Sequence, residues 1–359
     1  MPVLSRRGAF PLHASVLGAL LAASSATPLY ALYQAAWHFP AMTLTVVFSS
    51  YALSLLLALL TAETLSDHFG RRPVLAGALL AEAVAMAVFA TAQAVPALIA
   101  ARILQGLATG VAPSAAGAAL LDFEDPRRPG RATAATALVQ YAPTRTVYLL
   151  LLLLFTAQAA ATLLTPETAH PHPGARHSLR PAVTVAPASR PALALATPGI
   201  AAAWAPGGFY SSLGPSLARL IAPHAARATG GLVFFTMTAA AGLAGHAGHA
   251  ARALPARSGP QPHSLLPLFA GAAVAGAGFG AVTQAALRLP LPPAALAERA
   301  GTLAAYYVRS YLAMSIPAVL AGLLTNLYGL QTAVSLYAVT VVLPALTGLT
   351  RAVRRPRTT

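Results

Sequence analysis

Long apolar stretches separated by short polar breaks run from one end of the chain to the other. An apolar stretch of about 20 residues crosses the hydrocarbon layer of a membrane as one α-helix. The pattern predicts ten such spans, near residues 11–34, 44–65, 74–92, 96–121, 145–164, 198–221, 229–250, 265–287, 301–324 and 331–350. Proline inside several spans is compatible with this, because neighbouring helices satisfy the freed backbone groups. We therefore expect an all-α polytopic membrane protein.

A polar break rich in proline, histidine and arginine separates five spans from the next five. We expect an N-terminal bundle over residues 1–164, a cytoplasmic linker over 165–197, a C-terminal bundle over 198–350 and a basic cytoplasmic tail over 351–359. Three histidines in the linker stand at irregular spacing among prolines, which favours a solvated linker over a metal site.

Composition excludes most soluble classes. Only 9% of the residues are charged, whereas a soluble domain carries about a quarter. The net charge of +15 would suit nucleic acid if the basic residues formed one surface, but all 23 are arginines and most lie in the polar breaks. Such loops are typical of the cytoplasmic face. We expect a multi-pass protein of the cell inner membrane with both termini in the cytoplasm and no nucleic-acid partner.

At two places the number of spans between successive basic loops does not allow both loops to be cytoplasmic. One span lies between the basic loops at 127–131 and 176–190, and one between those at 252–257 and 288–299, where an even number is needed. The stretch 132–142 would extend only about 16 Å as a helix, so it is interpreted as a re-entrant half-helix. An even number of spans between these loops would need two further helices. The topology of 132–164 and 251–287 therefore stays open.

Two short segments carry charged residues whose positions in a membrane protein point to a functional or structural role. The loop LSDHFGRRPVL places Asp67, Gly70, Arg71 and Arg72 between the second and third spans. The segment ARILQGLATG places Arg102 inside the fourth span, where a charge costs ~2.5–3.5 kcal/mol on insertion scales.

Further polar residues stand at membrane depth. Glu82 lies midway along the third span, where an acid can carry a proton in coupled transport. Arg309 lies inside the ninth span, and substrate contact and simple pairing are both open for it. His246 and His249 stand one helical turn apart, but no third ligand is evident, so we predict no metal site.

The two charged segments resemble signatures of the major facilitator superfamily of secondary transporters. The loop resembles the pattern G-x-L-x-D-x-x-G-R-R from its leucine onward, and the helix 4 signature R-x-x-Q-G is matched by Arg102, Gln105 and Gly106. The segment LTPETAH, which contains Glu167, is similar to the PET motif after helix 6, and TPLYALYQAAW resembles the bacterial drug-efflux branch. The resemblance covers nearly the whole chain and implies two bundles with alternating access.

The resemblance also implies roles for individual residues. Helices 1, 4, 7 and 10 of the family line a central cavity, which would bring these side chains toward the substrate: Tyr30, Tyr33, Gln34, Tyr210 and Gln284. For each of them, interfacial anchoring or core packing is an alternative. In the loop, Asp67 would lie near a helix N-terminus of the second half, and Arg71 would brace the loop.

The chain departs from the family pattern in two ways. Glu63 replaces the first glycine of the loop signature, and the fifth and ninth family helices are missing, which leaves about ten instead of twelve. The fifth helix of antiporters carries a further motif that bears on export. These departures leave open a degenerate relative that does not transport, with a structural or regulatory role in the membrane.

We expect a monomeric carrier that moves a small molecule across the bilayer, with a proton or another ion as its coupling partner. Proton-coupled efflux is the favoured mode, although import and export are not separated by the sequence. A channel is a poorer alternative because no charge ring or filter sequence is visible. The sequence has no phosphate-binding loop, no H-E-x-x-H segment and no cysteine, so we predict neither enzymatic activity nor a cofactor.

Overall fold

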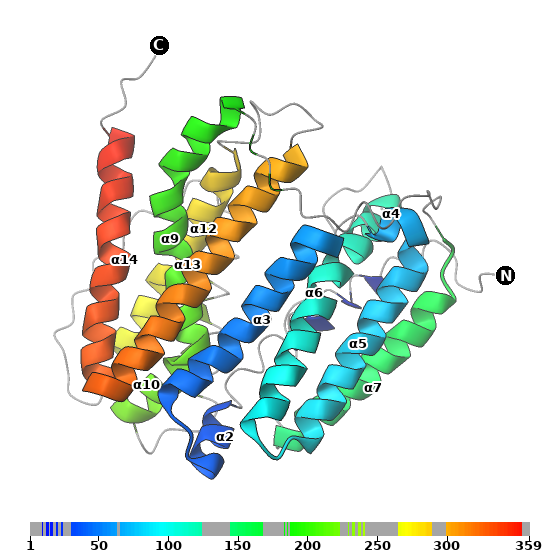
Figure 1. Ribbon diagram of the computed structural model, residues 1–359, viewed down its shortest axis with the longest axis horizontal. Helices are drawn as coiled ribbons and strands as arrows, with labels where there is room; N and C mark the ends of the chain where they lie inside the picture. The colour runs from blue at the N-terminus through cyan, green and yellow to red at the C-terminus, as the bar shows by residue number, and fades with distance from the viewer. Residues whose placement is uncertain are drawn as a thin grey trace. The chain divides into compact units, whose positions relative to one another are not determined.

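The computed structural model describes residues 30–62, 65–123, 144–167, 187–222, 265–288 and 299–353, with isolated positions between 9 and 23, 183 and 185, and 229 and 240. Every regular element in these ranges is helical (Figure 1). The chain divides into two compact units: unit 1 comprises Met1–Ala26 and Ser50–Ala182, and unit 2 comprises Thr27–Ser49 and Val183–Thr359. The division assigns 27–49 differently from the predicted bundles, and the predicted bounds stay a prediction.

Unit 1 is built around helix α5 (Arg71–Thr91), which packs against both α6 (Val95–Phe123) and α7 (Thr144–Leu163). Buried residues recur along α5 at the three- and four-residue spacing that places side chains on one side of a helix: Leu75, Ala76, Ala78, Leu79, Glu82, Ala83, Ala85, Met86 and Phe89. Near the end of this series, Phe89 stacks on Tyr148 of α7 at a centroid distance of 4.9 Å. The short α4 (Leu65–Phe69) precedes α5.

Two glycines let α6 approach helix α3 (Ala41–Ala62) closely. A Cβ atom on Gly106 would collide with the Ser54 hydroxyl and the Tyr51 carbonyl, and one on Gly110 would collide with Ala58. Small residues four apart allow such backbone contact where hydrophobicity does not drive helix association. The glycines therefore set the α3–α6 distance in unit 1.

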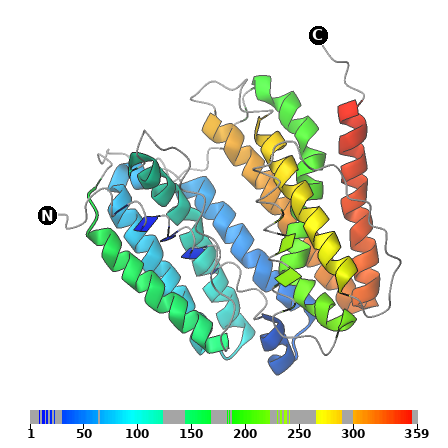
Figure 2. The same cartoon turned by 180° about the vertical axis from the view of Figure 1, so that it is seen from behind.

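In unit 2, helix α9 (Arg190–Ser212) packs against α12 (Leu266–Arg288), α13 (Arg299–Tyr328) and α14 (Leu330–Val353). Figure 2 shows α12 on the opposite side of this group from the view of Figure 1. Short elements flank α9: η3 (Pro187–Ser189) before it and α10 (Gly214–Ile221) after it. Helix α2 (Tyr30–Trp37) and the first part of α3 also belong to unit 2.

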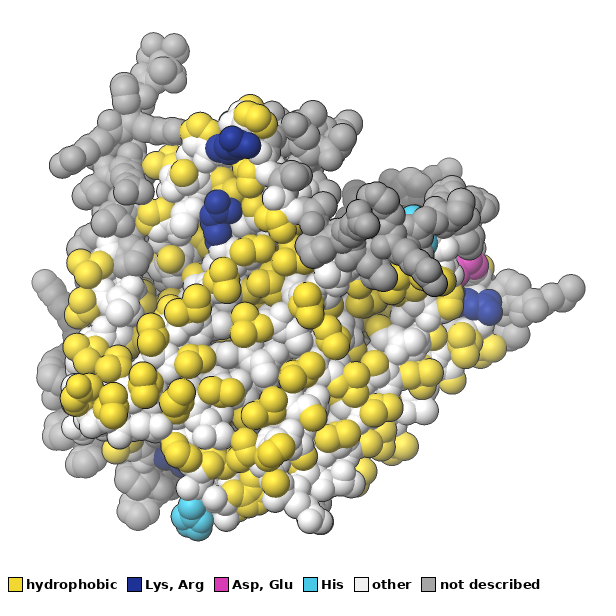
Figure 3. All heavy atoms as spheres, in the orientation of Figure 1, with side chains coloured by type: hydrophobic (Ala, Val, Ile, Leu, Met, Phe, Trp, Pro, Cys, Tyr) yellow, Lys and Arg dark blue, Asp and Glu magenta, His cyan; other side chains and the backbone are white. Residues whose placement is uncertain are grey.

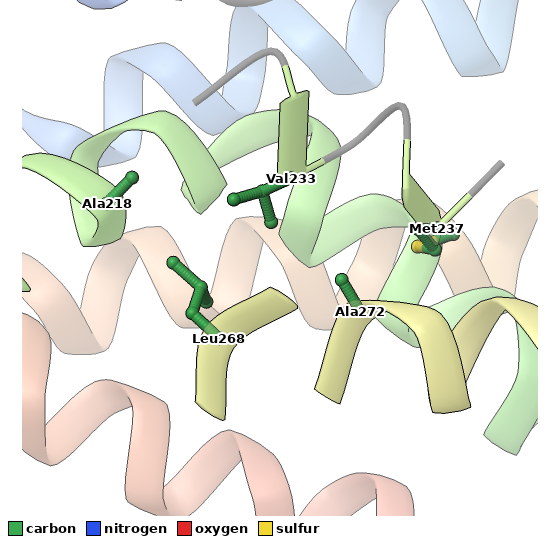
Figure 4. Close-up of a cluster of buried hydrophobic side chains, with 5 residues drawn as sticks. All are labelled: Ala218, Val233, Met237, Leu268 and Ala272. Atoms are coloured by element: carbon green, nitrogen blue, oxygen red, sulfur yellow. The ribbon is translucent and has the colours of Figure 1, made fainter. Parts of the chain in front are cut away.

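Apolar contacts and close backbone packing hold unit 2 together. One buried cluster joins α10, α12 and the chain between them (Figure 4): Ala218, Val233, Met237, Leu268 and Ala272. A Cβ atom on Gly208 of α9 would collide with the backbone of Met314 in α13, and one on Gly322 would collide with Thr45 of α3. Glycine thus permits helix contact in unit 2 as it does in unit 1.

Six helices among the described residues are long and apolar enough to cross a membrane: Ala41–Ala62, Arg71–Thr91, Val95–Ala112, Thr146–Leu163, Leu266–Thr283 and Gly301–Tyr328. They agree with six of the ten predicted spans. Helix α14 covers the span predicted at 331–350, and the shorter stretch Leu330–Val341 within it is apolar. Figure 3 shows hydrophobic side chains spread over the described surface of the face seen in Figure 1, with few charged side chains among them, as expected of a surface in contact with lipid.

The span predicted at 198–221 is wrong as a single helix. Helix α9 begins earlier, at Arg190, and has a proline in its first turn. It ends at Ser212, and α10 begins at Gly214. Pro215 explains the break, because proline has no N–H to donate to the preceding turn. The predicted spans 11–34 and 229–250 and the predicted half-helix 132–142 lie largely or wholly outside the described residues.

We predict that Gly106→Val destabilises unit 1. The added methyl groups would force α6 away from α3, and overpacking of this kind costs about 1–3 kcal/mol. Thermal unfolding of the purified protein in detergent measures the change as a lower midpoint temperature. The matched control is Gly77→Val in α5, where a Cβ atom meets nothing within 4 Å; an equal loss in both variants would contradict the prediction.

Candidate functional site

A group of polar side chains lies buried between α5 and α6. Glu82 of α5 and Arg102 of α6 are fully buried, and Gln105 is 1% exposed. Thr109 donates a hydrogen bond to Glu82 Oε1 at 2.5 Å, and Arg102 Nη1 donates one to Gln105 Oε1 at 2.6 Å. The Arg102 guanidinium also interacts electrostatically with the Glu82 carboxyl group. We call Glu82, Arg102, Gln105 and Thr109 the buried polar cluster.

Aromatic rings complete the surroundings of the arginine. The guanidinium carbon of Arg102 lies 5.0 Å from the ring centroid of Tyr51 and 5.8 Å from that of Phe89. A cation over the face of an aromatic ring is attracted by the negative face of the π-system, more so when water is excluded. The arginine is thus held by an amide, by two rings and by the field of an acid, which reduce the cost of burying its charge.

The helical register brings the cluster together. Arg102, Gln105 and Thr109 follow at three- and four-residue spacing, so they share one side of α6. Glu82 lies on the buried side of α5. Its second oxygen, Oε2, is buried and has no hydrogen-bond partner within the described ranges. A carboxyl group with one unfilled hydrogen-bonding position, placed in a membrane span, is suited to binding a proton.

The loop between α3 and α5 is tied to the end of α7 by Glu167. The Arg71 backbone N–H donates to Glu167 Oε1 at 2.9 Å, and the Arg72 backbone N–H donates to Oε2 at 3.1 Å. The Arg72 side chain also donates to the Thr165 carbonyl at 3.4 Å. The carboxylate therefore fills two of the open N–H positions at the N-terminus of α5, where the helix dipole favours negative charge.

Glycine is required at position 70 for two reasons. Gly70 is buried and has a φ of 94°, a backbone conformation that glycine adopts without strain. A Cβ atom there would also lie too close to the Glu167 carboxylate. The glycine of the loop signature therefore makes room for the acid that binds the next two amides.

The remaining predicted site residues whose side chains are described lie in unit 2. Arg309 Nη1 donates to the Ala305 carbonyl of its own helix at 2.9 Å. In unit 2, Gln34 of α2 donates to the Phe39 carbonyl at 3.3 Å and accepts a bond from Ser216 of α10 at 3.5 Å.

Two predicted cavity tyrosines have other surroundings. Tyr33 packs against Trp37 at 4.8 Å, and the Tyr210 hydroxyl lies beside Gly271 of α12. The predicted cavity role of these residues stays a prediction.

Several predicted residues lie outside the description. They are Glu63, His246 and His249, together with the side chains of Tyr30, Asp67 and Gln284. Within the described ranges, no group of three potential metal-binding side chains comes together.

Sequence reasoning missed two parts of the site. Thr109 was not singled out, because its contact with Glu82 depends on the register between two helices. Glu167 was identified only as part of a motif, and no residue near it in sequence points to the amides of Arg71 and Arg72.

Part of the chain is similar to a known protein family. A sequence profile described as Major Facilitator Superfamily matches residues 12–139. A search of curated proteins found no match.

Three solved transporter structures resemble the chain over nearly its whole length. A mutant of the nucleoside transporter NupG is 12% identical, with a TM-score of 0.63, and covers 97% of this chain and 100% of its own. The human organic anion transporter MFSD10 is 17% identical, with a TM-score of 0.55 and coverage of 96% and 100%. A bacterial homolog of the human lysosomal transporter Spinster, inward-facing and unoccupied, is 11% identical, with a TM-score of 0.69 and coverage of 99% of both chains.

The predicted fold class is confirmed: the chain is an all-α polytopic membrane protein with the fold of these transporters. The first part of the chain, residues 12–139, is similar to the Major Facilitator Superfamily, and the fold is that of the transporters above.

We predict that Glu167→Ala destabilises unit 1 by about 1–2 kcal/mol, because two amides at the start of α5 lose a charged acceptor. Thermal unfolding in detergent measures the shift. Thr91→Ala provides the control, since Thr91 is exposed at the other end of α5 and donates to its own helix. An unchanged midpoint for Glu167→Ala would contradict the proposed contact.

Proposed function

We propose that this protein belongs to the major facilitator superfamily and is a secondary active carrier that exports a small organic molecule in exchange for protons. The observation that carries the proposal is the buried polar cluster, in which Glu82 lies fully buried beside Thr109 and in the field of Arg102. An acid and a base buried together in the membrane part of a carrier are a functional site by default, because either alone is costly there.

Coupling follows from the arrangement of these groups. When Glu82 is ionised, its charge attracts the Arg102 guanidinium, and when it binds a proton that attraction is lost. Arg102 then has Gln105 and the rings of Tyr51 and Phe89 as its remaining partners. Proton binding therefore changes the forces between α5 and α6, and a carrier in which the two states favour different conformations is coupled to the proton gradient.

The other predicted residues keep supporting roles in this proposal. Asp67, Gly70, Arg71 and Arg72 form the gating loop, and its attachment to Glu167 supports a structural link between the loop and the end of α7. Substrate would pass residues of helices that line the family's central cavity. Two of the similar structures are of a nucleoside transporter and an organic anion transporter, which supports a small organic substrate here.

Glu82→Gln is expected to uncouple transport from the proton gradient. Glutamine keeps an acceptor for Thr109 but cannot exchange a proton, so dye accumulation in proteoliposomes driven by a pH gradient should fall to the level without a gradient. Exchange of labelled for unlabelled dye, which needs no proton, should persist. A panel of fluorescent dyes supplies the substrate, and Gly77→Ala on the same helix is the control.

Two results would overturn the proposal. Full gradient-driven accumulation by Glu82→Gln would exclude Glu82 as the coupling residue. No movement of any dye by the unmodified protein, although folded and inserted, would favour the alternative of a degenerate relative with a structural or regulatory role, which the departure at Glu63 first suggested.

A further inference from the structure

Arg309 differs from the other arginine that lies well inside a described membrane span. Arg102 is fully buried beside an amide, two rings and an acid. Arg309 lies in the span Gly301–Tyr328 and keeps part of its side chain accessible. Among the described residues, the Ala305 carbonyl is the one hydrogen-bond or ion-pair partner of its guanidinium. A guanidinium has five N–H donors, so Arg309 can still bind an anion.

Unit 2 has a large excess of positive charge. Its sequence, residues 27–49 and 183–359, contains twelve arginines and a single acid, Glu298. Helices α9 and α13 begin at the same end of unit 2 (Figure 1), and the first residue of α9 is the exposed Arg190. This charge favours an anionic partner from outside the unit.

An exposed apolar stripe continues along α13 from Arg309. Leu312, Ile316 and Leu320 follow the arginine at three- and four-residue spacing, so they share its side of the helix. Their side chains are 37%, 53% and 52% exposed. From Arg309 to Leu320 the helix rises about 16 Å, which is close to half of the ~30 Å hydrocarbon thickness of a bilayer. We call these four residues the α13 stripe.

The charge lies at one end of the stripe. Arg309 Nη1 donates to the carbonyl of Ala305, which lies one turn toward the start of α13, whereas the three apolar side chains lie toward its end. The stripe therefore offers a cation followed by an apolar surface as long as one leaflet. A guanidinium binds phosphate through two parallel N–H bonds, and a phosphate joined to acyl chains is a phospholipid.

We propose that the α13 stripe binds one anionic phospholipid, with the lipid phosphate at the Arg309 guanidinium and an acyl chain along Leu312, Ile316 and Leu320. A bound phosphate would balance an arginine charge that is costly next to lipid tails alone. The net charge of the headgroup would decide selectivity, because a zwitterionic lipid offers the same chains but offsets its phosphate with its own amine.

Native mass spectrometry of the full-length protein tests the proposal by counting bound lipids. Protein purified in detergent is titrated with phosphatidylglycerol, or with phosphatidylcholine that has the same acyl chains. One phosphatidylglycerol is expected to bind saturably and more tightly than phosphatidylcholine. Inorganic phosphate should displace it no better than chloride at equal ionic strength, because a free anion lacks the acyl chain.

Variants separate this site from a general effect of charge. Arg309→Gln should weaken phosphatidylglycerol binding about fivefold and leave phosphatidylcholine binding unchanged. Arg309→Lys keeps the charge and should retain most of the affinity. Arg219→Gln is the matched control, because it removes another exposed arginine of unit 2, in α10 and away from the stripe; it should bind as the unmodified protein does.

Several results would overturn the proposal. Equal affinity for the two lipids, or equal weakening by Arg309→Gln and Arg219→Gln, would show that the stripe selects nothing. Displacement of the lipid by inorganic phosphate would indicate a site for a free anion. Loss of dye transport by Arg309→Gln with unchanged phosphatidylglycerol binding would assign the arginine to the substrate path instead. Lipid binding is measured without transport, so its outcome does not depend on the proposed proton coupling.

Discussion

Burial of opposite charges at membrane depth is the constraint on which the N-terminal unit depends. Lipid tails offer neither water nor counterions, so an isolated arginine or glutamate inside a span must find partners within the protein. Here Thr109 donates a hydrogen bond to Glu82, and Gln105 accepts one from Arg102. The rings of Tyr51 and Phe89 lie beside the Arg102 guanidinium. The register between α5 and α6 is thereby fixed by polar contacts as well as by apolar packing.

Glycine provides the complementary constraint. Helices that carry buried polar groups must approach closely enough for short hydrogen bonds, and Gly106 directly follows Gln105 on α6. By admitting the backbone of α3, Gly106 brings Tyr51 within reach of the Arg102 guanidinium. The R-x-x-Q-G pattern therefore combines a charge, the amide that binds it and the small residue that lets a neighbouring ring cover it.

Apolar length alone was sufficient to predict much of the fold. Six membrane-spanning helices agree with predicted spans because the need for about 20 apolar residues is a local property of the sequence. The break between α9 and α10 is not predicted by apolar length, because proline inside a span is compatible with a continuous helix.

Contacts between helices could not be predicted from the sequence alone. The partners of Glu82 and of the Arg71 and Arg72 amides lie 27 and about 95 residues away. Trp204 and Tyr306 likewise form a hydrogen bond across 102 positions of the sequence. Arg102 and Glu82 could be singled out, because a charge in a span is visible without knowledge of its neighbours.

The bond between Glu167 and the start of α5 has a mechanical consequence. The stretch that connects the two halves of the sequence follows directly after Glu167, so tension along it would reach α5 through two backbone amides as well as reaching α7 through the chain itself. Helices α5 and α7 would then move together under this tension.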